Sequence, residues 1–206
     1  MSADGFRTLA DTVEFRQKIE RSEFLAIAFP VSSDEEFFAR LTAIEKRHFD
    51  ATHHCWAFRL FADGDARQRS SDAGEPSGTA GKPILSAIEG AGFHDCGVVV
   101  VRWYGGVKLG SGGLSRAYRD SAAGALAVAR PRGRFLYQRF TITVPFALLS
   151  VAYRLAAPPD VILDGEDYGQ TNSFRFDVRL SVAETFARAL DERRLPFTRD
   201  ITPRLR

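Results

Sequence analysis

Apolar and polar positions in the first fifty residues predict a β-hairpin followed by a helix. Residues 12–31 alternate apolar and polar side chains on both sides of a polar stretch at 18–23, which is typical of two paired strands. Ser32 or Ser33 then precedes three acidic residues, as helix N-caps do, and apolar residues recur at helical spacing as far as about His48.

The pattern continues with two strands and a helix. Residues 52–61 are interpreted as a strand with alternate side chains on opposite faces, and the apolar run at 96–103 is typical of a buried central strand. Between them, the polar stretch at 62–80 is interpreted as a loop, and a helix is expected over 82–92.

The last third of the chain predicts a second domain with the element order βαββαβ, the split βαβ of ferredoxin-like folds. Its expected strands lie at 135–144, 161–168, 171–180 and 197–201, and its expected helices at 146–157 and 182–194. The run Pro131-Arg132-Gly133 is typical of a break between elements and is interpreted as the domain boundary. We therefore expect an α+β protein with domains at 1–131 and 132–206.

Composition excludes several classes of protein. Hydrophobic residues make up 45% of the 206 residues and aromatic residues 12%, enough to bury a core and to exclude wholesale disorder. No apolar run approaches the roughly 18–20 residues of a membrane span, and no secretory signal is visible, so a cytoplasmic location without a membrane partner is expected. Cys55 and Cys96 cannot form a disulfide framework and are expected to be thiols.

Positive charge gathers in one segment, although the net charge of the whole chain is only +2. Between residues 102 and 134, Asp120 is the only acidic residue, and the basic residues are Arg102, Lys108, Arg116, Arg119, Arg130, Arg132 and Arg134. An anion-binding face would explain this pattern, and so would a solvated helical face. The sequence leaves both interpretations open.

Glycines cluster between residues 64 and 113, and the second half of the cluster lies between a buried strand and a helix expected over 114–129. Backbone N–H groups and the positive end of a helix would meet there and form an anion pocket, although glycines that let a tight turn pack on the strand would give the same pattern. The candidate nucleic-acid- or anion-binding residues are Arg102, Tyr104, Gly105, Gly106, Lys108, Gly110, Gly112, Gly113, Arg116 and Arg119.

Two other chemistries are suggested by residue types in this region. Asp72 and Glu75 in the polar loop are candidates for binding a divalent ion or orienting a water, although a plain surface loop has the same composition. A Cys₂His₂ zinc site would need the pairs His53/Cys55 and His94/Cys96 to lie on neighbouring strands. Because the usual zinc spacings are absent, no metal site is predicted.

Three motifs in order, covering roughly residues 14–130, resemble the YigZ/IMPACT family. They are DATHHCWA at 50–57, SDAGEPSGTAGKP at 71–83, and VRWYGGVKLG at 101–110 with Gly112-Gly113-Leu114 after it. His54 stands where the family pattern is expected to have Asn. The candidate site residues that the resemblance carries over from the first two motifs, here called the motif loop, are His53, Asp72, Gly74, Glu75, Ser77, Gly78, Thr79 and Lys82.

The resemblance implies an N-terminal domain like the second domain of small-subunit ribosomal protein five, with a ferredoxin-like domain after it. It also implies a translation-linked or nucleic-acid-binding role with no established reaction. Eukaryotic relatives regulate translation through an extra N-terminal partner domain, so that particular partnership is not carried over to this chain.

The sequence and the resemblance therefore suggest two functions. The favoured one is a translation-linked regulator that binds RNA, the ribosome or a translation-associated protein through the glycine loop and the basic helix, without catalysis or cofactor. The alternative is a phosphate- or nucleotide-handling enzyme in which Asp72 and Glu75 would hold Mg²⁺ and Lys82 or Lys108 would contact phosphate. The chain is short for such an enzyme, and no adenine-side motif is visible. The sequence does not indicate an oligomeric state.

Overall fold

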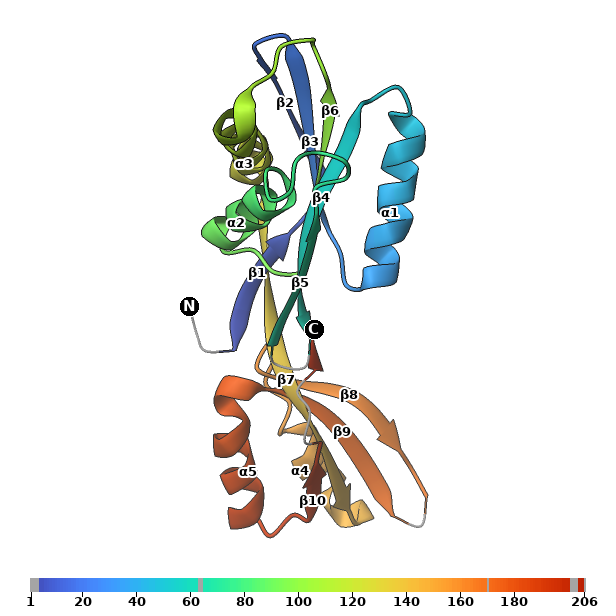
Figure 1. Cartoon of the computed structure of the whole chain (residues 1–206). Helices are drawn as coiled ribbons and strands as arrows, with labels where there is room; N and C mark the ends of the chain where they lie inside the picture. Colours follow the sequence, from blue (N-terminus) through green and yellow to red (C-terminus); the bar gives the residue numbers. More distant parts are fainter. Residues whose placement is uncertain (1–3, 63–64, 170, 201–203, 206) are drawn as a thin grey trace. The chain divides into compact units, whose positions relative to one another are not determined.

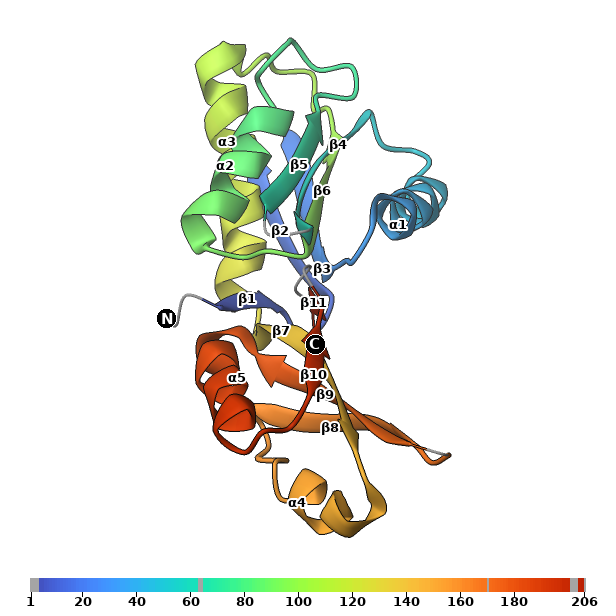
Figure 2. The same ribbon diagram turned by 90° about the horizontal axis from the view of Figure 1, so that it is seen from below.

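The chain folds into two compact units of mixed α and β structure (Figures 1 and 2). The computed structural model describes residues 4–62, 65–169, 171–200 and 204–205. One unit comprises residues 7–133, and the other comprises the segment from Arg134 onward together with the N-terminal residues as far as Phe6. The division expected between residues 131 and 132 stays a prediction of where the N-terminal domain ends.

The unit formed by residues 7–133 is built on one antiparallel sheet with helices on both faces (Figure 1). Its strands, in spatial order, are β2 (Val13–Ile19), β3 (Ser22–Pro30), β6 (Cys96–Trp103), β4 (His53–Ala62) and β5 (Asp65–Ser71). Its helices are α1 (Asp34–Arg47), α2 (Gly81–Ala91) and α3 (Gly110–Val128). Helix α1 covers one face of the sheet, whereas α2 and α3 cover the other.

Local sequence signals set the ends of these helices. Ser33 is the N-cap of α1, and its hydroxyl accepts a hydrogen bond from the backbone N–H of Glu36 (3.2 Å). Helix α2 ends at Gly92, whose φ of 68° lies in the left-handed region that glycine adopts without a Cβ clash. Both helix ends lie where the sequence predicts them.

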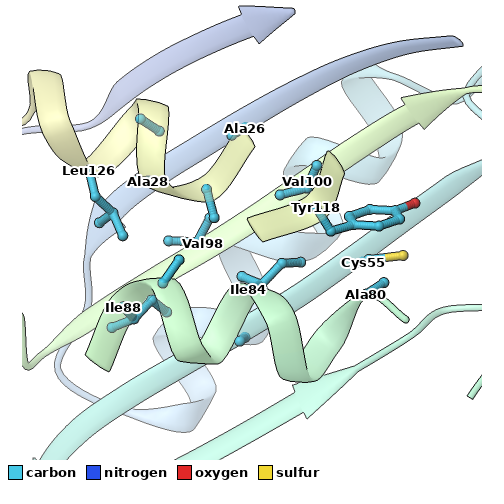
Figure 3. Packing of buried hydrophobic residues seen from close by; sticks show 14 of the residues in the cluster. Ala26, Ala28, Cys55, Ala80, Ile84, Ile88, Val98, Val100, Tyr118 and Leu126 are labelled. Atoms are coloured by element: carbon cyan, nitrogen blue, oxygen red, sulfur yellow. The ribbon is translucent and has the colours of Figure 1, made fainter. Parts of the chain in front are cut away.

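Alternation along the central strands gives the sheet two different faces. Toward α2 and α3 it presents the small side chains Ala26, Ala28, Cys55, Ala57, Val98 and Val100 (Figure 3). Toward α1 it presents larger ones, among them Leu25, Ile27, Phe29, Phe58 and Leu60. Because both faces are buried, β3 and β6 are apolar almost throughout, which confirms the prediction of a buried central strand at 96–103.

The other unit has the predicted order βαββαβ. Its elements are β7 (Pro131–Val144), η1 (Phe146–Leu148) continuing into α4 (Leu149–Tyr153), β8 (Val161–Asp167), β9 (Asn172–Arg179), η2 (Leu180–Val182) continuing into α5 (Ala183–Glu192), and β10 (Phe197–Arg199). Strands β9 and β10 both pair with β7, and β8 pairs with β9, all antiparallel. This arrangement is ferredoxin-like and confirms the α+β class. β1 (Gly5–Leu9) and β11 (Arg204–Leu205) also belong to this sheet, beside β7.

Two predictions for the first unit were wrong. The polar stretch at 62–80 is not all loop, because it contains β5, which pairs with β4 alone as an edge strand. The exposed Arg67, Gln68 and Arg69 remove the apolar alternation that would have indicated a strand, as polar residues commonly do on sheet edges. Helix α3 begins at Gly110 rather than at residue 114, so Gly112 and Gly113 lie in its first turn and not in the loop.

Smaller differences concern the N-terminal segment and the ends of individual strands and helices. The sequence predicts no strand at β1, and β7 begins at Pro131 rather than at residue 135. Helix α4 ends at Tyr153, and hydrogen-bonded turns replace its predicted extension to residue 157, before the two prolines Pro158 and Pro159. The predicted end of the last strand at Ile201 lies outside the described residues.

Candidate functional site

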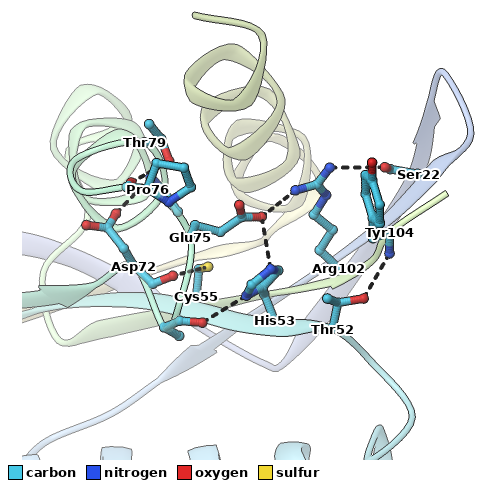
Figure 4. Close-up of polar contacts among 12 residues, drawn as sticks. Ser22, Thr52, His53, Cys55, Asp72, Glu75, Pro76, Thr79, Arg102 and Tyr104 are labelled. Atoms are coloured by element: carbon cyan, nitrogen blue, oxygen red, sulfur yellow. Dashed lines mark hydrogen bonds and ion pairs between the residues drawn. The ribbon is translucent and has the colours of Figure 1, made fainter. Parts of the chain in front are cut away.

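One carboxylate, that of Asp72, holds the motif loop in place (Figure 4). Its Oδ1 accepts hydrogen bonds from the backbone N–H groups of Ala80 (2.9 Å) and Gly81 (2.8 Å), and its Oδ2 accepts one from Gly78 (2.7 Å). The carboxylate therefore accepts hydrogen bonds from backbone N–H groups at the start of α2, which have no acceptor within the helix. Burial alone would raise the pKa of Asp72, but these hydrogen bonds and the charge of Lys82 outweigh it and hold the pKa below its usual value.

Acidification is expected to weaken this loop. The folded-state pKa of Asp72 lies below its ordinary value of 3.8, so the stabilisation is complete above about that pH and is lost as the pH falls through the folded-state pKa. The free energy of unfolding of wild type and Asp72→Asn should be measured in urea between about pH 3 and 7. We expect the difference between them to shrink toward acid pH. The control Asp120→Asn, an exposed carboxylate 3.6 Å from Arg119, should match wild type throughout, and an Asp72→Asn difference independent of pH would contradict this account.

Glu75 lies at the centre of a buried polar network beside the sheet (Figure 4). Its Oε1 accepts hydrogen bonds from Arg102 Nη1 (2.5 Å) and from the Tyr118 hydroxyl (2.7 Å), and lies 3.8 Å from His53 Nε2. The side chains of Glu75 and Arg102 are only 3% and 5% exposed. Charges so deeply buried are tolerated only when they are paired, so each of these two residues depends on the other.

The guanidinium of Arg102 lies between two aromatic rings. Its Cζ is 5.4 Å from the ring centroid of Phe24 and 5.3 Å from that of Tyr104, and its Nη2 donates to Ser22 Oγ (3.2 Å). Both distances are within the range of cation–π attraction. Arg102 therefore directs its charge into the domain, whereas Tyr104, which is 44% exposed, presents the outer ring of the stack to solvent.

The remaining polar groups of the network position the loop rather than activate a nucleophile. His53 Nδ1 lies 3.0 Å from the carbonyl oxygen of Ala73, which can only accept, so Nδ1 carries the proton. The Cys55 thiol donates to the carbonyl oxygen of Asp72 (2.9 Å), and burial raises the pKa of Cys55 to about 12. Burial likewise raises the pKa of Tyr118. At neutral pH both groups stay protonated.

The glycine loop between β6 and α3 has steric reasons for three of its glycines. A Cβ at Gly105 would lie 1.8 Å from the backbone oxygen of Arg21, so a side chain does not fit there. Gly106 and Gly110 have φ values of 86° and 67°, in the left-handed region. The tight-turn interpretation therefore explains these positions, and anion binding by the loop backbone stays a prediction.

A cationic hollow of about 320 Å³ opens between α2 and α3. It is lined by Gly78, Lys82, Pro83, Ser86, Ser115, Arg116 and Arg119. Arg119 Nε lies 3.6 Å from the Asp120 carboxylate, whereas Lys82 and Arg116 form no ion pair with any side chain in the described part of the chain. Two helices thus bring three cations and two hydroxyls to one place on the surface.

The predicted site residues fall into two groups and some outliers. His53, Glu75 and Arg102 meet in the buried network, with Gly74 against the His53 ring, whereas Gly78, Lys82, Arg116 and Arg119 line the cationic hollow. Lys108 and Ser77 are exposed, Gly112 and Gly113 begin α3, and the buried Thr79 hydroxyl donates to the Pro76 carbonyl (2.7 Å).

Sequence reasoning missed two members of the network, Tyr118 and Ser22. Tyr118 lies on the buried side of α3 with Leu114 and Ala122, so helical periodicity indicates its burial but not its hydrogen bond to Glu75. Ser22, in the hairpin, carries no sequence signal of its contact with Arg102.

The geometry does not assemble the metal sites considered from the sequence. In the described ranges, no group of three or more His, Cys, Asp or Glu residues is placed to hold an ion. The register of β4 and β6 sets Cys55 opposite Val100 and Cys96 opposite Arg59, so the two Cys/His pairs do not face each other. The hydrogen bonds described above engage both carboxylate oxygens of Asp72 and Oε1 of Glu75. No helix of the described chain is both long and apolar enough to cross a membrane.

Comparison with known proteins agrees with the resemblance seen in the motifs. The profile described as Impact N-terminal domain matches residues 20–126, which include all three motifs. An IMPACT family member of Haemophilus influenzae is 31% identical over 182 residues, which is 88% of each chain. The IMPACT family member YigZ of Escherichia coli is 33% identical over 153 residues, 74% of this chain and 75% of its own.

A solved structure is similar across both units. The crystal structure of a hypothetical protein matches 94% of this chain and 96% of its own, with 29% identity and a TM-score of 0.69. The molecule is thus a two-domain α+β protein whose motifs converge on a buried Glu–Arg pair and a cationic helical surface. The chain belongs to the IMPACT family.

Proposed function

We propose that this chain is a cytoplasmic, translation-linked regulator that binds RNA or the ribosome through the cationic surface of α2 and α3. The cations of this surface are Lys82 on α2 and Arg116 and Arg119 on α3, and Lys108, in the glycine loop before α3, is also exposed. The family resemblance supports the link to translation. The observation that carries the proposal is the hollow at which Lys82, Arg116 and Arg119 meet, because cations held at fixed positions attract phosphates and release their counterions.

The exposed ring of Tyr104 supports the same function. It is stacked on Arg102, which is itself held by Glu75, so the ring is presented from a rigid support. Aromatic rings on such supports stack with unpaired bases, which adds affinity without sequence preference. The enzyme alternative is less well supported, because the described hydrogen bonds of Asp72 and Glu75 serve the loop backbone and Arg102.

Charge reversal in the hollow is expected to weaken RNA binding. Arg116→Glu removes one phosphate contact and adds a repulsive charge, so affinity for structured RNA should fall at least about tenfold at low salt, and the salt slope should decrease by about one. Fluorescence anisotropy over a series of salt concentrations measures both quantities, and co-sedimentation with ribosomes provides a second readout.

The matched control is Lys46→Glu. Lys46 is equally exposed but lies in the last turn of α1, on the opposite face of the sheet, so its reversal changes net charge by the same amount. Loss of affinity in both variants would indicate only a response to net charge, and binding unaffected by Arg116→Glu would refute the assigned surface.

A further inference from the structure

The cationic hollow continues into a second hollow farther along α2 and α3. Ser86 and Arg119 line both of them. The second hollow measures about 540 Å³ and is lined additionally by Arg7, Ala87, Gly90, Ala91, Phe93, Asp120, Ala123, Leu126, Ala127, Ala129 and Pro131. Both volumes lie within the roughly 300–1,000 Å³ of typical small-molecule sites. Together they form one groove, here called the α2–α3 groove.

The two ends of the groove differ in chemistry. The first end offers the cations Lys82 and Arg116 with the hydroxyls of Ser86 and Ser115, and no carboxylate lines it. The second end is lined by five alanines and one glycine together with the larger apolar residues Leu126 and Phe93, and Arg119 lines both ends.

The few charged groups at the second end are engaged with neighbouring atoms. Arg7 Cζ lies 5.4 Å from the ring centroid of Phe93, and Arg7 Nη2 donates to the Ala91 carbonyl (2.7 Å). Asp120 lies against Arg119. The second end therefore presents a mainly apolar surface beside an arginine, which suits a flat organic ring.

We infer that the α2–α3 groove binds a nucleoside phosphate. The phosphate would be held among Lys82, Arg116 and Arg119, and the base would occupy the adjoining hollow beside Phe93. Charge-assisted hydrogen bonds from lysine and arginine are the usual means of holding phosphate, and the small side chains leave room for a ring. A free nucleotide and the phosphorylated end of an RNA chain supply the same chemistry, and only the second source rests on the proposed function.

Gly90 allows a test that leaves charge unchanged. No heavy atom lies within 4 Å of the position of a Cβ at Gly90, so Gly90→Phe is expected to fill the second hollow without a clash, and Gly90→Ala is its matched control. Thermal unfolding of both variants should show a midpoint no lower than that of wild type, since glycine is a poor helix former.

The full-length protein should be titrated calorimetrically with adenosine 5′-monophosphate, adenosine and inorganic phosphate. We expect the monophosphate to bind at least about tenfold more tightly than adenosine, and Arg116→Glu to remove most of this difference. Gly90→Phe should lower the affinity for the monophosphate but not the affinity for inorganic phosphate. Gly90→Ala and Lys46→Glu should bind both ligands as wild type does. Adenosine binding as tightly as the monophosphate, or monophosphate affinity unchanged by Gly90→Phe, would overturn the inference.

A pair of oligoribonucleotides that differ only in a 5′-phosphate distinguishes the two sources. Tighter binding of the phosphorylated oligonucleotide, reversed by Gly90→Phe, supports an RNA end, and equal binding of the pair supports the free nucleotide when the monophosphate itself binds. If Gly90→Phe leaves all nucleotide affinities unchanged while Arg116→Glu still lowers the affinity for structured RNA, this inference fails and the proposed function stands. If Arg116→Glu affects the monophosphate alone, the proposed function fails instead.

Discussion

Replacement of Glu75 by alanine is expected to lower the free energy of unfolding by about 3–5 kcal/mol, because it leaves the guanidinium of Arg102 buried without its counter-ion. The Tyr118 hydroxyl would lose its acceptor at the same time. Urea unfolding at neutral pH, followed by the fluorescence of Trp56 and Trp103, measures the change. The exposed Glu89→Ala on α2 is the control and should stay within about 0.5 kcal/mol of wild type.

A double-mutant cycle separates the interaction energy between Glu75 and Arg102 from the contribution of each side chain's other contacts. Arg102→Met alone should destabilise because it leaves the carboxylate of Glu75 buried, whereas Glu75→Gln with Arg102→Met removes both charges and should cost less than the two single changes together. If Glu75→Ala costs no more than Glu89→Ala, the network does not have the structural role assigned to it here.

Gly105→Ala is expected to destabilise the protein by about 3 kcal/mol or more, because the added Cβ overlaps backbone rather than a flexible side chain. The nearest atom, the backbone oxygen of Arg21, would lie at 1.8 Å, so the turn of the hairpin and the glycine loop cannot both keep their positions. Thermal and urea unfolding measure the loss.

Gly112→Ala is the matched control for this change. Gly112 lies in the first turn of α3 with no heavy atom within 4 Å of a Cβ, so alanine should leave stability unchanged or raise it by up to about 1 kcal/mol. Equal effects at the two glycines would show that the close approach of Gly105 to Arg21 does not constrain the fold.

Most of the fold could be predicted because local signals and the buried pattern agree. The Ser33 cap and Gly92 mark helix ends, and alternation along β4 places Cys55 and Trp56 on opposite faces, as expected. The exceptions have physical causes. Strand β5 is stabilised by pairing with β4 rather than by buried side chains, so its polar sequence is indistinguishable from a loop.

The candidate site was predicted as a set of residues but not as a set of contacts. The motifs name Glu75 and Arg102, yet their ion pair joins positions 27 residues apart, and periodicity does not report such pairings. The sequence predicts that Arg102 binds an anion. In the structure its guanidinium is paired with Glu75 and lies near the rings of Phe24 and Tyr104. Of the predicted basic site residues in the described chain, Lys82, Arg116 and Arg119 lie together at a surface hollow, because α2 packs beside α3.

The carboxylate of Asp72 also governs how the motif loop moves. Three amide hydrogens, those of Gly78, Ala80 and Gly81, depend on the same side chain, and the carbonyl of Asp72 is tied to the sheet through Cys55. A displacement of the Asp72 side chain would therefore weaken all three of these hydrogen bonds at once. We therefore expect this glycine-rich segment, which as a free chain would sample many conformations independently, to open as one cooperative element.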